Sequence, residues 1–389
     1  MLINRRAFLE RGIALGSLLA LPRISWAQGD PGTKQPGART LVMLHLNGGN
    51  DGLNTVIPHT DPWYRVLRPG LAIDDGRIRK IHERFGLHPA LAGFEQLWKR
   101  DRLAIVNGVG YPNPNYSHFR ATEIFYTAQP ERSPESGWLG RAMDAKPSEK
   151  PLRAIALGKE KPLSLQCAAP GIVTLTEFKQ FKLPEDMQAT VEMYEASRDL
   201  AGERGAVARR ALEAIDVARR IASLNPVRTS FYGALGRELG KVVALLRSDL
   251  DLEVIHLSFG GFDTHANQAA SHNRLLAEVG NNLNAYQAML DKAGIADRVT
   301  TCVFSEFGRR AGENLSGGTD HGSAYPLFLI GKGVLPGIHG AYPSLEDLEN
   351  GNFKYTTDFR RVYATLLREV LASDPGAVLG AFEPMELMA

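Results

Sequence analysis

Cysteine is scarce in this sequence, because its 389 residues include only Cys167 and Cys302. The chain has no C-x-x-C pair, so a thiolate zinc site is not expected. Cys302 lies in the apolar run VTTCVF, where a buried and unreactive thiol is the expected state. A disulfide between the two cysteines stays open, because pairing cannot be deduced from spacing.

An excess of either charge is also missing, since 45 basic and 43 acidic residues give a formal net charge of +2. No long run of like charge occurs, so neither a nucleic acid nor a membrane surface is an expected partner. The glycine patterns of dinucleotide-binding and P-loop proteins are absent, which leaves a nucleotide-dependent oxidoreductase poorly supported. The composition is otherwise that of a soluble globular protein, with room for one large α/β domain or two smaller ones.

The N-terminal segment has the features of an export signal. Arg5 and Arg6 precede an apolar stretch, residues 12–21, which is too short to span a bilayer. A small-x-small site follows, so residues 1–27 are predicted to be a cleaved signal peptide. The paired arginines indicate the twin-arginine route, with an ordinary secretory signal as the alternative. Residues 28–39 are rich in glycine and proline and indicate a linker, and the mature protein is expected in the periplasm or outside the cell, without a membrane span.

Apolar runs alternate with helical patterns along residues 40–389, which are expected to form the folded domain. Several runs are nearly continuous hydrophobics, which is typical of strands covered on both faces. This alternation predicts an α/β fold with a mostly parallel, doubly wound sheet. The stretch from about 180 to 250 shows no strand pattern and is expected to form a helical insertion. The predicted strands are residues 41–46, 103–109, 152–157, 253–259, 299–305 and 325–330, and the clearest helices are residues 89–99, 118–126, 208–223, 230–246, 267–293 and 357–371.

Polar side chains gather just after the predicted strands, where ligands bind in open α/β sheets. Asp51 lies in the loop NGGNDGLN after the first strand and could direct a carboxylate at a cation, although such residues also favour turns for local reasons. Ser117 begins a helical pattern, and the free N–H groups of a first turn suit a nucleophile or an anion. A helix-capping serine is the alternative for Ser117. The neighbouring His118 is either functional or structural.

Three further loops at the same predicted edge carry Asp, Glu or His. A carboxylate and an imidazole two residues apart in a glycine-led loop can converge on one ion of zinc, manganese or iron. A helix cap would explain Asp263 but leaves His265 unexplained. Arg309 can hold an anionic substrate oxygen, with a surface ion pair as the alternative. The candidates are Asp263 and His265 in GGFDTHANQ, Glu306 and Arg309 in SEFGRR, and Asp320 and His321 in GGTDHG.

Eight short motifs follow one another over almost the whole chain. They are RRAFL, LNGGNDGLNTVIP, YSHFRA, SGWLGR, GGFDTHANQ, SEFGRR, GGTDHG and TTDFR. This series resembles the DUF1501 family, which is similar to a branch of the alkaline phosphatase/sulfatase superfamily. The resemblance implies an α/β/α sandwich with metal at the carboxyl edge of the sheet.

The resemblance also implies roles for the candidate residues. Asp51 matches the first-strand aspartate that binds metal in the superfamily, and Ser117 lies where the nucleophile is expected, at a helix N-terminus. Asp263 and His265 resemble the Asp/His pair of one metal site, which His321 completes.

One position departs from the superfamily pattern. Glu306 stands where the superfamily has an Asp-His pair, but the residue that follows it is Phe307. This difference puts a two-zinc site in doubt and favours one metal, or a second metal held loosely. Asp320 is implied either as a ligand or as the group that orients His321.

Together these features predict an exported, metal-dependent hydrolase of phosphate or sulfate esters. The expected cofactor is a divalent metal, zinc first, with manganese, calcium or iron as alternatives. The expected substrate is an anionic small-molecule ester or polymer, and Ser117 or a bound water is the expected nucleophile. The alternative is an exported, non-catalytic protein that keeps a metal and binds an anionic polymer or a protein partner, because a fold alone does not fix a function.

Overall fold

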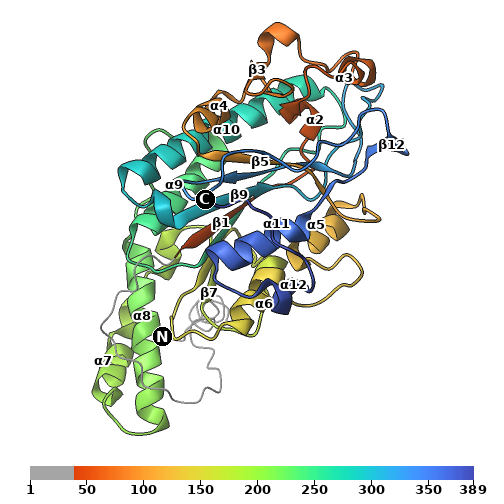
Figure 1. Ribbon diagram of the computed structural model, residues 1–389. Helices are drawn as coiled ribbons and strands as arrows, with labels where there is room; N and C mark the ends of the chain where they lie inside the picture. Colours follow the sequence, from red (N-terminus) through yellow and green to blue (C-terminus); the bar gives the residue numbers. More distant parts are fainter. Residues whose placement is uncertain (1–38) are drawn as a thin grey trace.

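The computed structural model describes residues 39–389 (Figure 1). The predicted signal peptide and residues 28–38 of the predicted linker lie outside these described residues. Within residues 39–389, no helix combines the length and the apolar character that crossing a membrane requires.

A central nine-stranded sheet runs through the molecule, in the order β11-β5-β10-β9-β1-β8-β6-β7, with β14 paired to β5. All neighbouring strands are parallel except β10, which is antiparallel to both β5 and β9. The mostly parallel sheet and all six predicted strands are therefore confirmed. The strands are β1 (Thr40–Leu46), β5 (Leu103–Gly110), β6 (Ala154–Leu157), β7 (Ile172–Leu175), β8 (Val254–Phe259), β9 (Val299–Phe304), β10 (Tyr325–Ile330), β11 (Gly337–His339) and β14 (Thr357–Asp358).

Helices cover both faces of this sheet, which gives the predicted α/β/α layers (Figure 1). Residues of α4, α8, α9 and α10 share one apolar cluster with the sheet, and residues of α5, α6, α11 and α12 share the other. The first group is α4 (Ala92–Lys99), α8 (Glu203–Ser223), α9 (Gly233–Arg247) and α10 (Gln268–Lys292). The second is α5 (His118–Thr127), α6 (Trp138–Ala145), α11 (Phe359–Thr365), which a π-helical turn extends to Val370, and α12 (Pro375–Leu379).

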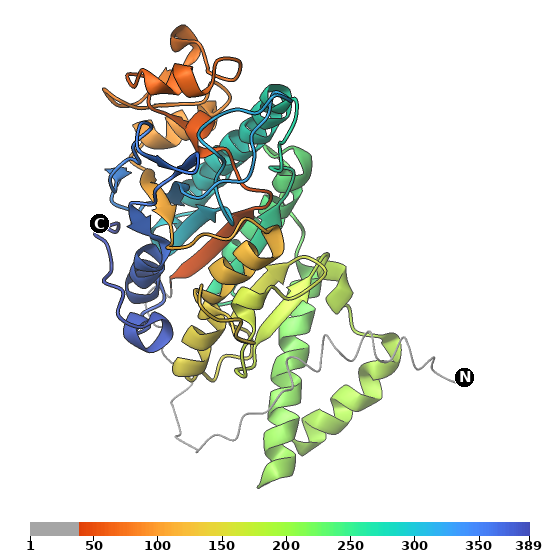
Figure 2. The ribbon, with the colours of Figure 1, turned by 90° about the vertical axis from the view of Figure 1, so that its right-hand side faces the viewer.

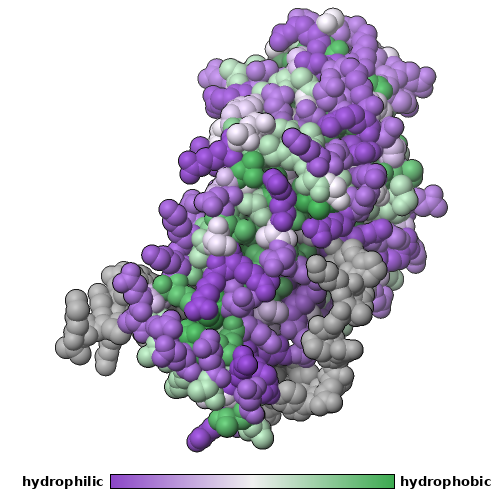
Figure 3. Space-filling model, turned by 90° about the vertical axis from the view of Figure 1, so that its left-hand side faces the viewer, coloured by the Kyte–Doolittle hydropathy of each residue, from purple (hydrophilic) through white to green (hydrophobic). Residues whose placement is uncertain are grey.

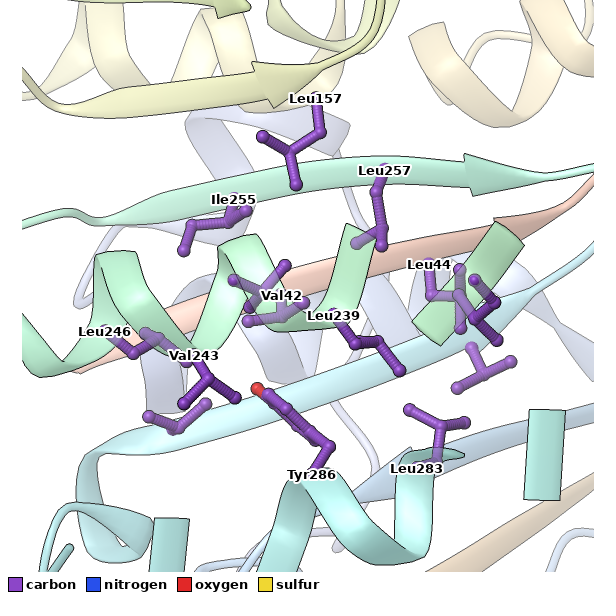
Figure 4. Packing of buried hydrophobic residues seen from close by; sticks show 14 of the residues in the cluster. Val42, Leu44, Leu157, Leu239, Val243, Leu246, Ile255, Leu257, Leu283 and Tyr286 are labelled. Carbon is purple, nitrogen blue, oxygen red and sulfur yellow. The ribbon is translucent and has the colours of Figure 1, made fainter. Parts of the chain in front are cut away.

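The two faces follow from the alternation of side chains along a strand. In β1, Leu41 and Met43 join the cluster beneath α5, α6 and α11, whereas Val42 and Leu44 join the opposite cluster. Figure 4 shows the second set, with residues of α9 and α10 packed on residues of β1 and β8. Burial of each such side chain contributes roughly 1.5–3 kcal/mol, so a continuous apolar run specifies a strand in the centre of the sheet.

One helical pair reaches beyond the sheet. Helix α7 (Gln188–Ser197) packs on α8, and both views of the ribbon show this pair extending away from the layers (Figures 1 and 2). The C-terminal half of α8 joins the main core, through residues that include Ala214, Val217 and Ile221. The surface on this side is mostly hydrophilic, with scattered apolar patches (Figure 3).

Smaller elements lie outside the main sheet. A three-stranded sheet pairs β4 with β2 and β3, and β12 pairs with β13. Two short helices, α2 and α3, flank β2. The bounds are α2 (Gly52–Thr55), β2 (Val56–Ile57), α3 (Trp63–Leu67), β3 (Arg79–Lys80), β4 (Gly86–Leu87), β12 (Leu348–Glu349) and β13 (Asn352–Phe353).

The direction of the strands determines where the candidate loops meet. Strands β1, β5, β8 and β9 all end at the same edge of the sheet, because they run in the same direction. Strand β10 runs the other way, so it begins at that edge and the whole segment 305–324 stays there. The open question about the cysteines is also answered: Cys167 and Cys302 are both free thiols, and Cys302 is buried in β9 as predicted.

Candidate metal centre

The carboxylate of Asp263 lies at the centre of a histidine cluster. Its Oδ1 atom is 3.0 Å from Nε2 of His265 and 3.0 Å from Nε2 of His321, and its Oδ2 atom is 3.3 Å from Nε2 of His118. The Nε2 atoms of His265 and His321 are 2.9 Å apart. Four side chains from two loops and the start of α5 therefore present one carboxylate and three ring nitrogens to one small volume.

The second nitrogen of each histidine fixes the orientation of its ring. Nδ1 of His321 lies 2.7 Å from the carbonyl oxygen of Tyr116, which can only accept a hydrogen bond. Nδ1 of His118 lies 2.7 Å from Oε1 of Glu306, and Nδ1 of His265 lies 3.3 Å from Oδ1 of Asp320. These acceptors place the proton of each neutral ring on Nδ1. The three Nε2 lone pairs consequently point toward Asp263 and toward one another, which is unfavourable unless a cation lies between them.

The donor atoms fit a transition metal. Zinc binds imidazole nitrogen and carboxylate oxygen at about 2.0–2.2 Å, so tetrahedral donors lie about 3.3 Å apart. The measured separations of 2.9–3.3 Å around Asp263 match that spacing. Within the described residues, one group of three or more candidate ligands has its donor atoms within 4.8 Å of one another, and it consists of His118, Asp263 and His321. His265 lies outside this group, although its Nε2 atom contacts both Asp263 and His321. Ligating histidines that donate Nδ1–H to carboxylate or carbonyl oxygens are the usual arrangement around a bound metal.

Asp263 is held in its ionised form. Burial alone would raise the pKa of this carboxyl group, but the hydrogen bond and the positive charge of Arg309 outweigh that effect and lower the pKa to about 2. The carboxylate is therefore negative at any pH at which the protein would work.

Arg309 is buried, and the N–H groups of its side chain bond to other groups of the protein. The sequence predicted that this guanidinium holds a substrate oxygen, yet its side chain makes five hydrogen bonds to Asp263 and to backbone carbonyl groups, and Nη1 also lies 3.5 Å from Nε2 of His265. Nε donates to Gly49 O at 2.7 Å, Nη1 to Thr319 O at 2.8 Å, and Nη2 to Phe262 O at 2.9 Å, to Asp263 Oδ1 at 2.7 Å and to Gly48 O. The geometry thus makes Arg309 the group that ties the loops after β1, β8 and β9 together, and it leaves little of the guanidinium for a substrate.

The glycine pair after β1 allows these loops to approach closely. Gly48 has φ +118° and Gly49 has φ +76°, which side chains other than glycine rarely adopt. A Cβ atom on Gly48 would also lie 2.8 Å from the carbonyl carbon of Phe262. The close approach brings the carbonyl groups of Gly48 and Gly49 to the guanidinium of Arg309.

Glu306 supports the cluster from behind. Its Oε1 accepts hydrogen bonds from Gly48 N at 2.8 Å and from His118 Nδ1 at 2.7 Å, and its Oε2 accepts one from His45 Nε2 at 3.0 Å. Burial alone would raise its pKa, but the hydrogen bonds from His118 and His45 hold the pKa well below its usual range. Both oxygens are committed, so the structure places Glu306 as the partner that orients His118 and does not place it at the metal position predicted from the sequence.

We predict that Glu306→Gln weakens metal binding without removing a ligand. In the glutamine variant an NH₂ group replaces one of the two carboxylate oxygens. That NH₂ group would meet the N–H group of either His45 or His118, so the ring concerned must change tautomer or rotate. Loss of such a partner costs about 10- to 100-fold in metal affinity. The affinity for zinc, measured by competition with a chelator, should fall within that range. Glu253→Gln is the matched control, because Glu253 pairs with Arg153 away from the site and should leave the affinity unchanged.

Asp51 does not join the cluster. Its carboxylate is fully buried and forms a two-point ion pair with Arg68, at 2.7 Å and 3.0 Å, and also accepts a hydrogen bond from Gln268. The same arginine donates to the carbonyl groups of Ala311 and Arg310. A buried guanidinium thus occupies the place where the resemblance implied that a metal would be, and the geometry gives no support to Asp51 as a ligand.

The remaining predicted residues lie around the cluster. Ser117 is the N-terminal cap position of α5, as predicted, but its hydroxyl makes no capping hydrogen bond and is exposed, next to His118. Asp320 contacts Nδ1 of His265 rather than His321, which the sequence suggested as its partner. Phe307 packs its ring on His118 and His321, at 5.0 Å and 4.6 Å between centroids.

Sequence reasoning missed two contributors and left a third undecided. His118, which stayed open between a functional and a structural role, lies in the cluster. Arg68 was not singled out because an arginine in a loop gives no signal. His45 was read as part of the apolar strand LVMLHL, although a single imidazole in such a run is a sign of a buried polar partner.

The fold and the cluster define an α/β protein with a His/Asp group at the carboxyl edge of its sheet. Residues 102–379 match the family described as "Protein of unknown function (DUF1501)", and the chain belongs to this family. A comparison with curated proteins finds no match.

Among solved structures, the chain is similar to several of low sequence identity. A protein in the alkaline phosphatase superfamily from Vibrio parahaemolyticus is 11% identical, with 99% of this chain and 80% of that chain covered and a TM-score of 0.41. The PsFucS1 sulfatase from Pseudoalteromonas sp. is 12% identical, with 98% and 72% covered and a TM-score of 0.40. The phosphonate monoester hydrolase of Agrobacterium radiobacter is 12% identical, with 75% and 68% covered and a TM-score of 0.38. At these values no conclusion about activity follows from the likeness.

Proposed function

We propose that this protein is an exported hydrolase of phosphate or sulfate esters that depends on one divalent metal ion, zinc first. Asp263, His118, His265 and His321 would hold the ion. The observation that carries the proposal is the convergence of three Nε2 lone pairs on one carboxylate, with each Nδ1 committed to an acceptor. Export is supported by the paired arginines and apolar stretch of residues 1–27.

A single ion is favoured over two. A second site would need Asp51 and Glu306, but Arg68 and two histidines already occupy their oxygens. Phe307 packs its apolar ring beside the cluster, at a position where a second metal ion would need another ligand. The positive charge that a second metal would supply near Asp51 comes instead from the guanidinium of Arg68.

The chain's own residues can carry out the other parts of the reaction. When bound, a divalent ion at this centre supplies a Lewis acid and lowers the pKa of a water or hydroxyl near it. Ser117 has an exposed hydroxyl with no capping bond at the N-terminus of α5, so it is available to attack the ester. The free N–H groups of the first turn of α5 favour the negative charge that develops.

Arg310 is a better candidate than Arg309 for contact with the anionic part of the substrate. Its side chain is exposed, and within residues 39–389 it forms no ion pair, whereas Arg309 is buried and fully engaged. Its backbone N–H donates to Asp320 O at 3.0 Å, which places it directly beside His321. A guanidinium there can bind two oxygens of a phosphate or sulfate group.

The second candidate function is an exported metal protein without catalysis, which binds an anionic polymer or a protein partner. The buried ion pair of Asp51 with Arg68 favours it, because that pair removes one of the metal positions that the resemblance implied. Both functions share the single metal centre, so only turnover separates them.

The test is elemental analysis of the purified mature protein, followed by a screen of aryl phosphate and aryl sulfate esters. We expect about one zinc per chain and turnover that a chelator abolishes and added zinc restores. Metal without turnover, together with metal-dependent binding of a polyanion such as heparin, would support the non-catalytic alternative. A folded protein that neither holds metal nor gains it from solution would contradict both.

A further inference from the structure

A cavity lies beside the histidine cluster around Asp263. Its volume is about 470 Å³, and it lies between the carboxyl ends of β6 and β8, one face of α5 and the loop after β6. Phe119, Thr122, Glu123 and Tyr126 line it from α5 at the spacing of a single helix face. This volume is within the range of ligand pockets, about 300–1,000 Å³.

The cavity adjoins the histidine cluster at two points. Phe119 directly follows His118 on α5, so one turn of helix serves both. Asn47 lines the cavity after β1, and the next residue, Gly48, bonds to Glu306 through its N–H group. A molecule whose reacting group lies at Asp263 could therefore extend along α5 into the cavity.

Buried hydrogen bonds join the two places as well. Tyr126 lines the cavity, and its hydroxyl lies 2.9 Å from Nδ1 of His45. His45 bonds to Glu306 through Nε2, so the ring accepts at Nδ1 and the Tyr126 hydroxyl donates. Glu306 in turn bonds to His118. The floor of the cavity and the orientation of His118 thus belong to one network.

The lining has the chemistry of a site for a neutral polyol. Ser258 is exposed although β8 is otherwise buried, because the cavity opens on it. Glu123, Glu160 and Lys161 add both signs of charge, and Glu123 also pairs with Arg120 at 2.9 Å, so the lining has no excess of positive charge. That balance disfavours a further phosphate or sulfate, and the many polar groups disfavour an acyl chain. Hydroxyl groups can donate to the carboxylates and accept from the ammonium group.

An aromatic ring completes the lining. Phe119 is 91% exposed, which is unusual for a side chain whose burial contributes so much to stability. It lies on the helix face that lines the cavity. The ring of Phe119 offers an apolar surface on which the C–H face of a sugar ring can pack. The hydroxyl groups of the sugar can then reach the polar side chains that line the cavity.

From this geometry we infer that the cavity lined by Phe119, Tyr126 and Ser258 binds a sugar-like, uncharged polyhydroxylated group. This inference rests on the proposed function: the sugar-like group is the part of the ester substrate that carries the phosphate or sulfate, which is cleaved at Asp263. The protein would then act on sugar esters in preference to simple aryl esters.

The first test is direct binding of uncharged methyl glycosides to the mature protein, measured by ligand-observed NMR. We expect binding to at least one methyl hexoside, and Phe119→Ala should weaken it about tenfold, which corresponds to about 1.4 kcal/mol. Phe119→Trp should retain binding. Tyr232→Ala is the control, because Tyr232 is a half-exposed ring that does not line this cavity, and it should bind as the wild type does.

Two results would overturn the inference. One is a folded wild-type protein that binds none of the hexosides, and the other is binding that Phe119→Ala leaves unchanged. Both readouts are independent of catalysis. A protein that hydrolyses aryl esters but binds no glycoside would therefore disprove the sugar cavity alone. One that binds glycosides but hydrolyses neither sugar esters nor aryl esters would disprove the ester hydrolase alone.

Discussion

Asp263→Asn should abolish the metal centre. The bound zinc is expected to fall from about one ion per chain to below about a tenth, because the only carboxylate among the four donors is lost. Turnover of any ester that the wild type hydrolyses should fall at least about 10³-fold, since metal-dependent stabilisation of the developing charge is lost with the ion. Elemental analysis and steady-state kinetics measure the two effects.

The fold should survive this substitution. Asp263 lies in a loop with its side chain about half exposed, and Arg309 keeps its bonds to four backbone carbonyl groups. Circular dichroism should therefore match that of the wild type. Asp199→Asn is the control for loss of an exposed carboxylate, because Asp199 lies in the turn after α7, far along the chain from every donor. Full zinc content in Asp263→Asn would show that the centre is not where the geometry puts it.

The buried pair of Arg68 and Asp51 should give the largest effect on stability. Arg68→Met leaves the carboxylate of Asp51 buried without a cation, and breaking such a pair typically costs about 3–5 kcal/mol in the free energy of unfolding. Two backbone carbonyl groups, of Ala311 and Arg310, lose their donor at the same time. Guanidinium denaturation followed by tryptophan fluorescence measures the loss.

The same pair should contribute to acid sensitivity. Burial alone would raise the pKa of Asp51, but the charge and hydrogen bonds of Arg68 lower it to about 2, against about 3.9 in an unfolded chain. A depressed pKa in the folded state stabilises the protein above about pH 4, and this contribution is lost as the pH falls toward 2. The double variant Asp51→Asn with Arg68→Met should lose this part of the pH dependence.

Two comparisons make the prediction specific. Arg79→Met breaks a partly exposed pair with Glu95, and such pairs contribute about 0–1 kcal/mol, so its loss should be much smaller than that of Arg68→Met. The double variant should be more stable than Arg68→Met alone, because the uncompensated charge is gone. Equal losses in Arg68→Met and Arg79→Met would show that the Asp51 pair does not hold the loops.

The sequence alone determined the layers of the fold. Near-continuous apolar runs such as residues 41–46 and 299–305 are stable only when both faces are covered, so they specified central strands and the helices around them. The short strand β7 and helix α6 were missed, because segments of four and eight residues are too short to give a clear periodic signal. Helix α7 lies within the predicted helical insertion, about 180–250, but its bounds were not predicted. The antiparallel direction of β10 was also beyond reach, since strand direction depends on how the connecting loop folds.

The sequence also located the site in outline. Parallel strands that end at one edge bring their following loops together, which is why Asp263, His265 and His321 could be expected to meet. Ser117 as the N-terminal cap position of α5 was equally readable, since the pattern of the helix fixed where it begins.

Only the tertiary structure decided which side chains face one another. Asp51, Glu306 and Arg309 have the residue types of a ligand or a substrate contact, but Arg68, His45 and the surrounding backbone groups take up their hydrogen-bonding atoms. A carboxylate binds whichever cation or donor the folded chain places within about 3 Å, and residues far away in the sequence supply it. Residue type and strand order are local information, whereas the partners of a buried charge are set by the packing of the whole domain.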